Sequence, residues 1–148
     1  MLKKIFLAGV VLGLALAGVL AVLYVSNAAP AVAPVAADEA ARSGKPYVIK
    51  LHAQWCAVCL VTKDVWSEIE QRYANRVTLV VLDFTNDANR EASQAEAKRL
   101  GLQEFFDEYG GATGTIAVLD GRTRKVLASI DGNRDFAEYR TAIDGALK

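Results

Sequence analysis

The chain has few residues of the types that usually carry catalytic chemistry. Its 148 residues include two Cys, one His and one Met, so one chain cannot complete a four-coordinate zinc site from Cys and His alone. The 17 basic and 17 acidic residues cancel, and the composition therefore gives no indication of a polyanionic partner such as nucleic acid. No internal repeat is visible. The 53% of hydrophobic residues are enough for one domain with a core, plus appendages.

A long uncharged apolar segment follows Lys3 and Lys4. Residues 5–25 contain no charged side chain, and at about 1.5 Å of rise per residue a helix of this length spans roughly 30 Å, the thickness of a bilayer's hydrocarbon core. The two lysines are expected to keep the N-terminus in the cytoplasm. Residues 1–26 are therefore predicted to be a single-pass membrane anchor. A cleaved signal peptide is the alternative, because residues 26–28 resemble a cleavage site.

An Ala- and Pro-rich linker is predicted at residues 27–37. Pro30 and Pro34 lie among small residues that cannot form a core, and such a segment is typical of a semi-extended tether. It can reach at most about 36 Å. We therefore expect the domain to work close to the membrane, on its extracytoplasmic (periplasmic) side, with membrane proteins and exported chains as partners.

Residues 38–148 are predicted to fold as one domain. Strands are expected at residues 46–53, 76–84, 115–120 and 125–131, of which the last two form a hairpin. Helices are expected at residues 57–74, 86–101 and 134–148. The order β-α-β-α-β-β-α predicts an α/β fold with a mixed four-stranded sheet and helices on both faces.

Both cysteines lie where the first predicted strand gives way to a helix. In an extended chain the Cα atoms of Cys56 and Cys59 would lie roughly 10 Å apart, whereas one helical turn brings them within disulfide range. The helix N-terminus offers partial positive charge and unpaired N–H groups, which stabilise a thiolate at Cys56. The pair is therefore predicted to be a redox couple in which Cys56 attacks and Cys59 resolves.

Two other interpretations of the pair are open. A purely structural disulfide would stabilise the chain little, because it closes a very short loop. Alternatively, His52, Cys56 and Cys59 form a His-x3-Cys-x2-Cys pattern that supplies three ligands for copper or a similar metal. That pattern would make the domain a metal chaperone or metal-binding module.

The stretch "VIKLHAQWCAVC" resembles the strand, Trp-Cys-x-x-Cys turn and helix of the thioredoxin superfamily. The resemblance covers about residues 45–148, and "LDFTNDAN" with "AKRLGL" is most similar to the membrane-tethered and periplasmic reducing branch. It implies a monomeric thiol–disulfide oxidoreductase that needs no organic cofactor, because the dithiol stores the electrons. Its expected partners are disulfide-containing or dithiol exported proteins and a membrane or periplasmic electron donor. An adaptor whose disulfide never turns over is a further alternative.

The resemblance also implies a substrate groove at Trp55 and at Thr113, Gly114 and Thr115. The family usually has a cis-Pro in this loop, where the chain has Gly114. The Thr113–Gly114 bond is expected to be trans, since a non-proline cis bond costs about 2.5–4 kcal/mol. Glycine is permissive enough to imitate many backbone shapes.

Lys50 and His52 precede the cysteines in the chain, and both are candidates to influence the thiols without taking part in the exchange themselves. Lys50 aligns with the family's buried Asp, and a Lys there would favour a thiolate electrostatically. His52 is expected either to pack against the sheet or to tune the thiols. The central dipeptide, Ala57–Val58, lacks the His that the family's strong oxidases have, which favours a reductant or a modest isomerase.

Overall fold

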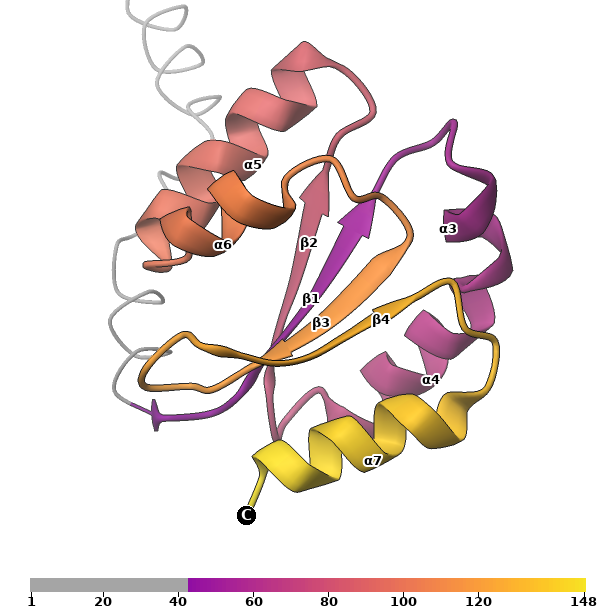
Figure 1. Cartoon of the computed structure of the whole chain (residues 1–148), viewed down its shortest axis with the longest axis vertical. Coiled ribbons are helices and arrows are strands. Elements are labelled where there is room, and N and C mark those ends of the chain that lie inside the picture. The colour runs from indigo at the N-terminus through magenta and orange to yellow at the C-terminus, as the bar shows by residue number, and fades with distance from the viewer. Residues whose placement is uncertain (1–42) are drawn as a thin grey trace, which may run out of the picture. The chain divides into compact units, whose positions relative to one another are not determined.

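The computed structural model describes residues 43–148, which form a mixed four-stranded sheet with helices on both faces (Figure 1). The strands are β1 (Tyr47–His52), β2 (Thr78–Asp83), β3 (Thr115–Leu119) and β4 (Val126–Asp131). The helices are α3 (Ala57–Val61), α4 (Lys63–Tyr73), α5 (Asp87–Arg99), α6 (Gln103–Tyr109) and α7 (Phe136–Ala146). The predicted α/β fold, its element order and its mixed sheet are confirmed.

The predicted membrane anchor at residues 1–26 and the linker at residues 27–37 lie outside the described residues. From residue 43 onwards, the structure contains no helix that is both long and apolar enough to cross a membrane.

The sheet has the strand order β2-β1-β3-β4. Strand β1 runs parallel to β2 and antiparallel to β3, and β3 runs antiparallel to β4. In this register His52, at the end of β1, pairs with Asp83 at the end of β2. Because β3 begins at Thr115, opposite that end of β1, the segment after β1 and the loop before β3 meet at the same edge of the sheet.

Strand β1 separates two apolar cores. Tyr47, Ile49 and Leu51 pack towards α5 and α6, while Val48 packs towards α4 and α7. All four side chains are fully buried, as expected for a central strand covered on both faces. Burying the side chains of Val48, Ile49 and Leu51 contributes about 1.5–3 kcal/mol each to folding, so β1 gives the following segment a rigid base.

The helix predicted over residues 57–74 is interrupted at Thr62, which corrects that expectation. Helix α3 ends at Val61 and α4 begins at Lys63, with Thr62 at φ −95° and ψ 5° between them. The Thr62 Oγ1 hydroxyl donates to the Val58 carbonyl at 3.1 Å, and such side-chain bonding to the preceding turn bends helices. The two cysteines therefore belong to a short helix of their own.

The other predicted helices agree with the structure to within two residues. Asn86 caps α5 by accepting from the Asn89 N–H at 2.9 Å, and Gly101 follows the helix with a φ of +69°. These are the preferred residue types at the two ends of a helix.

Candidate functional site

The two cysteines form a disulfide at the start of α3. Their Cα atoms lie 5.2 Å apart, which is within the range for an unforced disulfide. Cys56 is the N-cap of α3, and its Sγ accepts a hydrogen bond from the Cys59 N–H at 3.0 Å. The backbone N–H of Cys56 itself donates to the Ala53 carbonyl at 3.2 Å, which fixes the turn between β1 and α3.

The two sulfur atoms have opposite polar neighbours. Cys56 Sγ faces a donor, the Cys59 N–H, whereas Cys59 Sγ lies 3.7 Å from an acceptor, the Leu51 carbonyl oxygen. A donor stabilises a thiolate, and a carbonyl acceptor stabilises a protonated thiol. The Cys59 N–H lies in the first turn of α3 and is one of the unpaired N–H groups expected there from the sequence. The disulfide therefore has a donor beside one sulfur and an acceptor beside the other.

Trp55 lies next to the pair with 67% of its surface exposed. Its Nε1 donates to the Thr85 carbonyl at 3.1 Å, and the Gln54 N–H donates to the Thr85 hydroxyl at 3.0 Å. Thr85 follows β2, so the segment leading to Cys56 is attached to the neighbouring strand. The indole is therefore exposed while its polar edge is fixed.

Asp83 in turn holds Thr85. Its Oδ1 accepts from the N–H and the hydroxyl of Thr85, and its Oδ2 accepts from Asn89 Nδ2 at 2.8 Å. Desolvation raises the pKa of Asp83, but the hydrogen bonds from Thr85 and Asn89 outweigh it, so the pKa lies below the usual value of 3.8. Asp83 is therefore an ionised anchor for the Trp55 segment.

The loop of Thr113, Gly114 and Thr115 lies on the opposite side of the pair. A Cβ atom added to Gly114 would lie 3.6 Å from Cys56 Sγ, so this backbone covers the first sulfur. No cis peptide bond occurs within residues 43–148, and the expected trans bond before Gly114 is confirmed. Gly114 has a φ of +99°, a conformation that proline cannot adopt. Glycine therefore does not imitate the family's proline here.

Hydrogen bonds fix the backbone of this loop. The N–H groups of Thr113 and Gly114 donate to the Gly111 and Leu51 carbonyls, each at 2.8 Å. The Gly114 carbonyl accepts from the Gly132 N–H at 3.4 Å. Thr115 is 3% exposed, and its hydroxyl donates to Asp131. In the described part of the chain, no group donates to the Thr113 carbonyl.

Lys50 is buried on the face of the sheet that α4 and α7 cover. It is 8% exposed, and its Nζ lies 5.5 Å from the centre of the Trp66 ring. Burial lowers the pKa of Lys50 from its usual value of 10.5, and the nearby carboxylate of Glu70 opposes this shift only in part. Its predicted influence on the cysteines stays a prediction.

His52 is half-buried at the end of β1. Its Nδ1 atom is buried and has no hydrogen-bond partner within residues 43–148. In the same range, no group of three or more His, Cys, Asp or Glu side chains is placed to hold a metal ion. The three-ligand set of His52, Cys56 and Cys59 is therefore not assembled as a metal site in this structure.

Sequence reasoning missed four residues of the site: Val58 as a contact, Asp83, Thr85 and Gly132. Asp83 and Thr85 follow from the register, because Asp83 ends the strand that pairs with β1. Val58 contacts both Gly114 and Gly132, and no pattern of residue types along the chain indicates such a contact.

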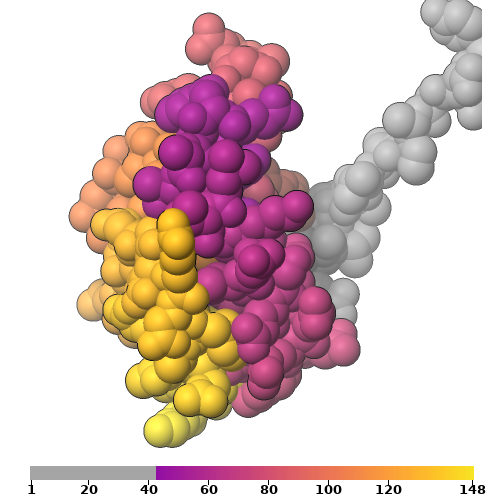
Figure 2. Space-filling view, turned by 90° about the vertical axis from the view of Figure 1, so that its right-hand side faces the viewer, coloured from indigo at the N-terminus to yellow at the C-terminus, as the bar shows by residue number. Residues whose placement is uncertain are grey.

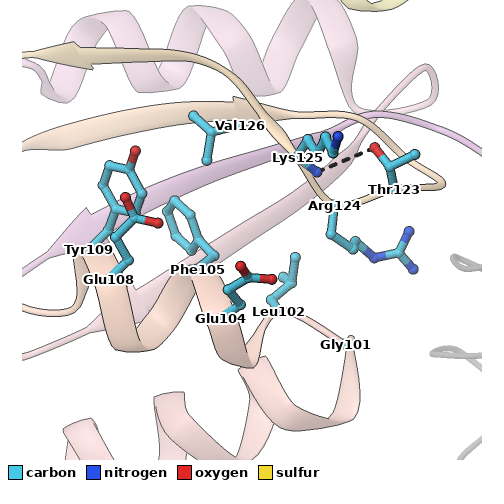
Figure 3. Close-up of a pocket in the computed structure, with 10 residues that line it drawn as sticks. All are labelled: Gly101, Leu102, Glu104, Phe105, Glu108, Tyr109, Thr123, Arg124, Lys125 and Val126. Carbon is cyan, nitrogen blue, oxygen red and sulfur yellow. Dashed lines mark hydrogen bonds between the residues drawn. The ribbon is translucent and has the colours of Figure 1, made fainter.

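A cavity of about 460 Å³ lies at the other end of the sheet (Figure 3). It is formed by α6 and the turn between β3 and β4, with Glu104 and Glu108 on one wall and Lys125 on another. Neither cysteine lines it. The cysteine pair, which is buried at the start of α3, is therefore separate from this cavity.

Comparison with known proteins identifies the family. The Thioredoxin family model matches residues 34–107, half of the chain. The thioredoxin-like protein HCF164, chloroplastic, is 32% identical over 81 residues in both Oryza sativa subsp. japonica and Arabidopsis thaliana. Each match covers 53% of this chain but only 30% and 31% of the two relatives, so the chain aligns with about a third of each.

A solved structure shares the fold. The crystal structure of Trxlp from Edwardsiella tarda has a TM-score of 0.51 at 17% identity, over 75% of this chain and 93% of that one. Thioredoxin-like proteins act on disulfide substrates and reductase partners through their cysteine pair. The chain belongs to the thioredoxin family, and Cys56 and Cys59 form the disulfide of its Cys-x-x-Cys pair.

Proposed function

We propose that this chain is a membrane-anchored oxidoreductase that reduces or exchanges the disulfides of exported proteins on the extracytoplasmic side. The observation that carries the proposed chemistry is the polar asymmetry of the pair, a donor at Cys56 Sγ and an acceptor at Cys59 Sγ. It supports Cys56 as the nucleophile and Cys59 as the resolving thiol.

The reaction then has two exchange steps. The Cys56 thiolate attacks one sulfur of a substrate disulfide, so a mixed disulfide forms and the other substrate sulfur leaves as a thiolate that takes up a proton. Cys59 loses its proton and attacks Cys56 Sγ, which closes the Cys56–Cys59 disulfide and releases the second substrate thiol. Two electrons pass from the dithiol to the substrate, and a dithiol donor restores the pair.

The groove proposed for the substrate lies between Trp55 and the loop of Thr113, Gly114 and Thr115. Trp55 offers an exposed apolar surface. The Thr113 carbonyl can accept from an N–H group of an extended peptide, in the manner of strand addition. The dipeptide between the cysteines, Ala57–Val58, supports the reducing direction through the family resemblance.

The roles of the two thiols are tested by trapping. In cells, Cys59→Ser should accumulate mixed disulfides with client proteins, because the first step proceeds and the second cannot. Cys56→Ser should accumulate almost none. Diagonal gels, non-reducing and then reducing, separate the trapped clients. Equal trapping by the two variants would remove the assigned roles, and the reduction potential of the pair decides the direction of electron flow.

The location is tested by fractionation. The uncharged segment at residues 5–25 supports a protein that stays with the membrane and whose domain is degraded by protease added outside the cytoplasm. A soluble exported form beginning near Ala29 would instead establish the cleaved signal peptide. A domain protected from external protease would contradict the extracytoplasmic assignment.

A further inference from the structure

Val58 occupies a space that two glycines leave open. It lies on α3 between the cysteines and is 42% exposed. A Cβ atom added to Gly114 would lie 2.6 Å from Val58 Cγ1, and one added to Gly132 would lie 2.8 Å from the same atom. Real Cβ atoms do not approach other carbons this closely, so the Val58 methyl group fills the space of both missing side chains.

The three residues come from separate parts of the chain. Val58 follows β1, Gly114 precedes β3, and Gly132 follows β4. Figure 2 shows the segment between β4 and α7, in yellow, directly beside the α3 region in indigo. Both glycines have a positive φ, +99° at Gly114 and +60° at Gly132, and the Gly132 N–H donates to the Gly114 carbonyl. The backbone that surrounds the Val58 side chain therefore has a conformation that favours glycine.

This contact lies directly beside the nucleophile. The Cβ atom added to Gly114, which would clash with Val58, would also lie 3.6 Å from Cys56 Sγ. Cys56 is only 6% exposed, so an incoming disulfide must approach its sulfur closely alongside Val58 and Gly114. Cys59, at 2% exposed, offers no other entry.

We propose that Val58 is a specificity-determining residue, whose side chain fills the space between Gly114 and Gly132 and restricts access to Cys56. Disulfides carried on narrow, flexible groups reach the sulfur past Val58, whereas disulfides within a broader polypeptide surface meet its methyl groups. The inference rests on the proposed disulfide exchange and adds which substrates the site accepts.

The test compares two matched variants of the full chain with two substrates. Val58→Ala removes the two methyl groups that lie in this space. Val61→Ala makes the same change on the same helix, at a residue that is 39% exposed and whose atoms are not among those nearest to an added Cβ at Gly114 or Gly132. The substrates are insulin, a polypeptide disulfide, and 5,5′-dithiobis(2-nitrobenzoic acid), a small one. The measured quantity is the ratio of kcat/KM for insulin to kcat/KM for the small disulfide.

We expect Val58→Ala to raise this ratio by about threefold or more, mainly through a lower KM for insulin, since a methyl group or two changes discrimination by such factors. Val61→Ala should leave the ratio as it is in the original chain. A ratio unchanged by Val58→Ala, or changed equally by Val61→Ala, overturns the inference while the proposed function stands. If the original chain reduces neither substrate, the proposed function fails and this inference fails with it.

A double-mutant cycle separates the contact from a general loss of packing. Gly132→Ala introduces a methyl group against Val58, and the strain from its positive φ is the same with and without Val58→Ala. We therefore expect Gly132→Ala to lower insulin kcat/KM in the original chain and to lower it much less in the Val58→Ala background. Additive effects would show that Val58 and Gly132 do not act through one contact, and would overturn the inference.

Discussion

The cysteine pair lies between two sides that are constructed differently. On the Trp55 side, made of Trp55, Asp83 and Thr85, side-chain hydrogen bonds fix the segment that leads to Cys56. On the Gly114 side, made of Val58, Gly114 and Gly132, the fit depends on two positions that lack side chains. One side is therefore vulnerable to the loss of a polar group, and the other to the gain of a methyl group.

The difference shows that a charged residue and a glycine can both tolerate few substitutions, for different physical reasons. An ionised carboxylate with several donors is hard to replace because each donor would lose its partner. A glycine with a positive φ against a neighbouring side chain is hard to replace because any Cβ atom causes strain and a clash. The following predictions test each side separately, from the largest expected effect to the smallest, and end on Lys50, which belongs to neither side.

Gly114→Ala should be the most damaging change. It adds the cost of a positive φ, about 1–2 kcal/mol, and overpacking against Val58 of about 1–3 kcal/mol. Gly111→Ala is a close control, because Gly111 has a φ of +109° and no atom within 4 Å of an added Cβ. Denaturant unfolding of the two variants measures the difference. Equal losses of stability would mean that the contact with Val58 costs nothing.

Asp83→Ala should lower the free energy of unfolding by about 2–3 kcal/mol, since hydrogen bonds to a charged group are lost and the donors stay behind. Hydrogen bonds keep the pKa of Asp83 low in the folded state. Its stabilisation is therefore complete above the unfolded pKa and is lost as the pH falls through the folded one. Unfolding curves measured across acidic pH should show a smaller fall in the free energy of unfolding for the variant than for the original chain. Asp87→Ala, at an exposed residue, is the control.

Tyr139→Phe tests the attachment of the Gly114 side, because the Tyr139 hydroxyl donates to the carbonyl of Asn133, next to Gly132, at 2.9 Å. The change should cost about 1 kcal/mol near neutral pH. Burial raises the pKa of Tyr139 to about 12 from 10.0. The unfolded chain therefore releases this proton first, and stability falls between these two values as the pH rises. A variant with the same alkaline decline as the original chain would contradict this assignment.

Lys50→Met should produce the smallest effect, and in the opposite direction. Because burial lowers the pKa of Lys50, its charge opposes folding below that pKa, and the penalty disappears as the pH rises towards 10.5. The variant should be more stable near neutral pH by up to about 1 kcal/mol, and the gain should shrink at alkaline pH. Lys98→Met, at an exposed residue on α5 that does not contribute to the pKa shift at Lys50, is the control. A variant less stable at neutral pH would show that the contact with Trp66 outweighs burial.

The sequence predicted the features of the fold and site that depend on local pattern. Mostly apolar runs rich in β-forming residues identified β1 and β2, capping residues identified α5, and the position of Cys56 at a helix start indicated the redox pair. Each of these signals lies within a few neighbouring residues. The element order then determined the sheet, because a strand–helix–strand unit pairs in parallel and a hairpin pairs in antiparallel.

The features that the sequence did not predict depend on contacts between distant segments. The family resemblance identified Gly114 as the loop residue, but neither its φ of +99° nor its contact with Val58 could be predicted from it. The break at Thr62 was hidden because the apolar spacing of residues 57–74 continues through it. Side-chain bonding of Thr62 to the turn before it decides between one helix and two, and periodicity does not report that choice.

The break at Thr62 has a consequence for how the domain opens. Helix α4 buries Val65, Trp66, Ile69 and Tyr73 in the core, whereas α3 buries only Cys59. The amides of α3 should therefore exchange with solvent deuterium through a low-energy local opening, while those of α4 exchange only when the whole core unfolds. Breaking the sulfur–sulfur bond should accelerate exchange in α3 alone. The segment whose covalent bond would change in each cycle of the proposed disulfide exchange would then be the smallest independent unit of the domain.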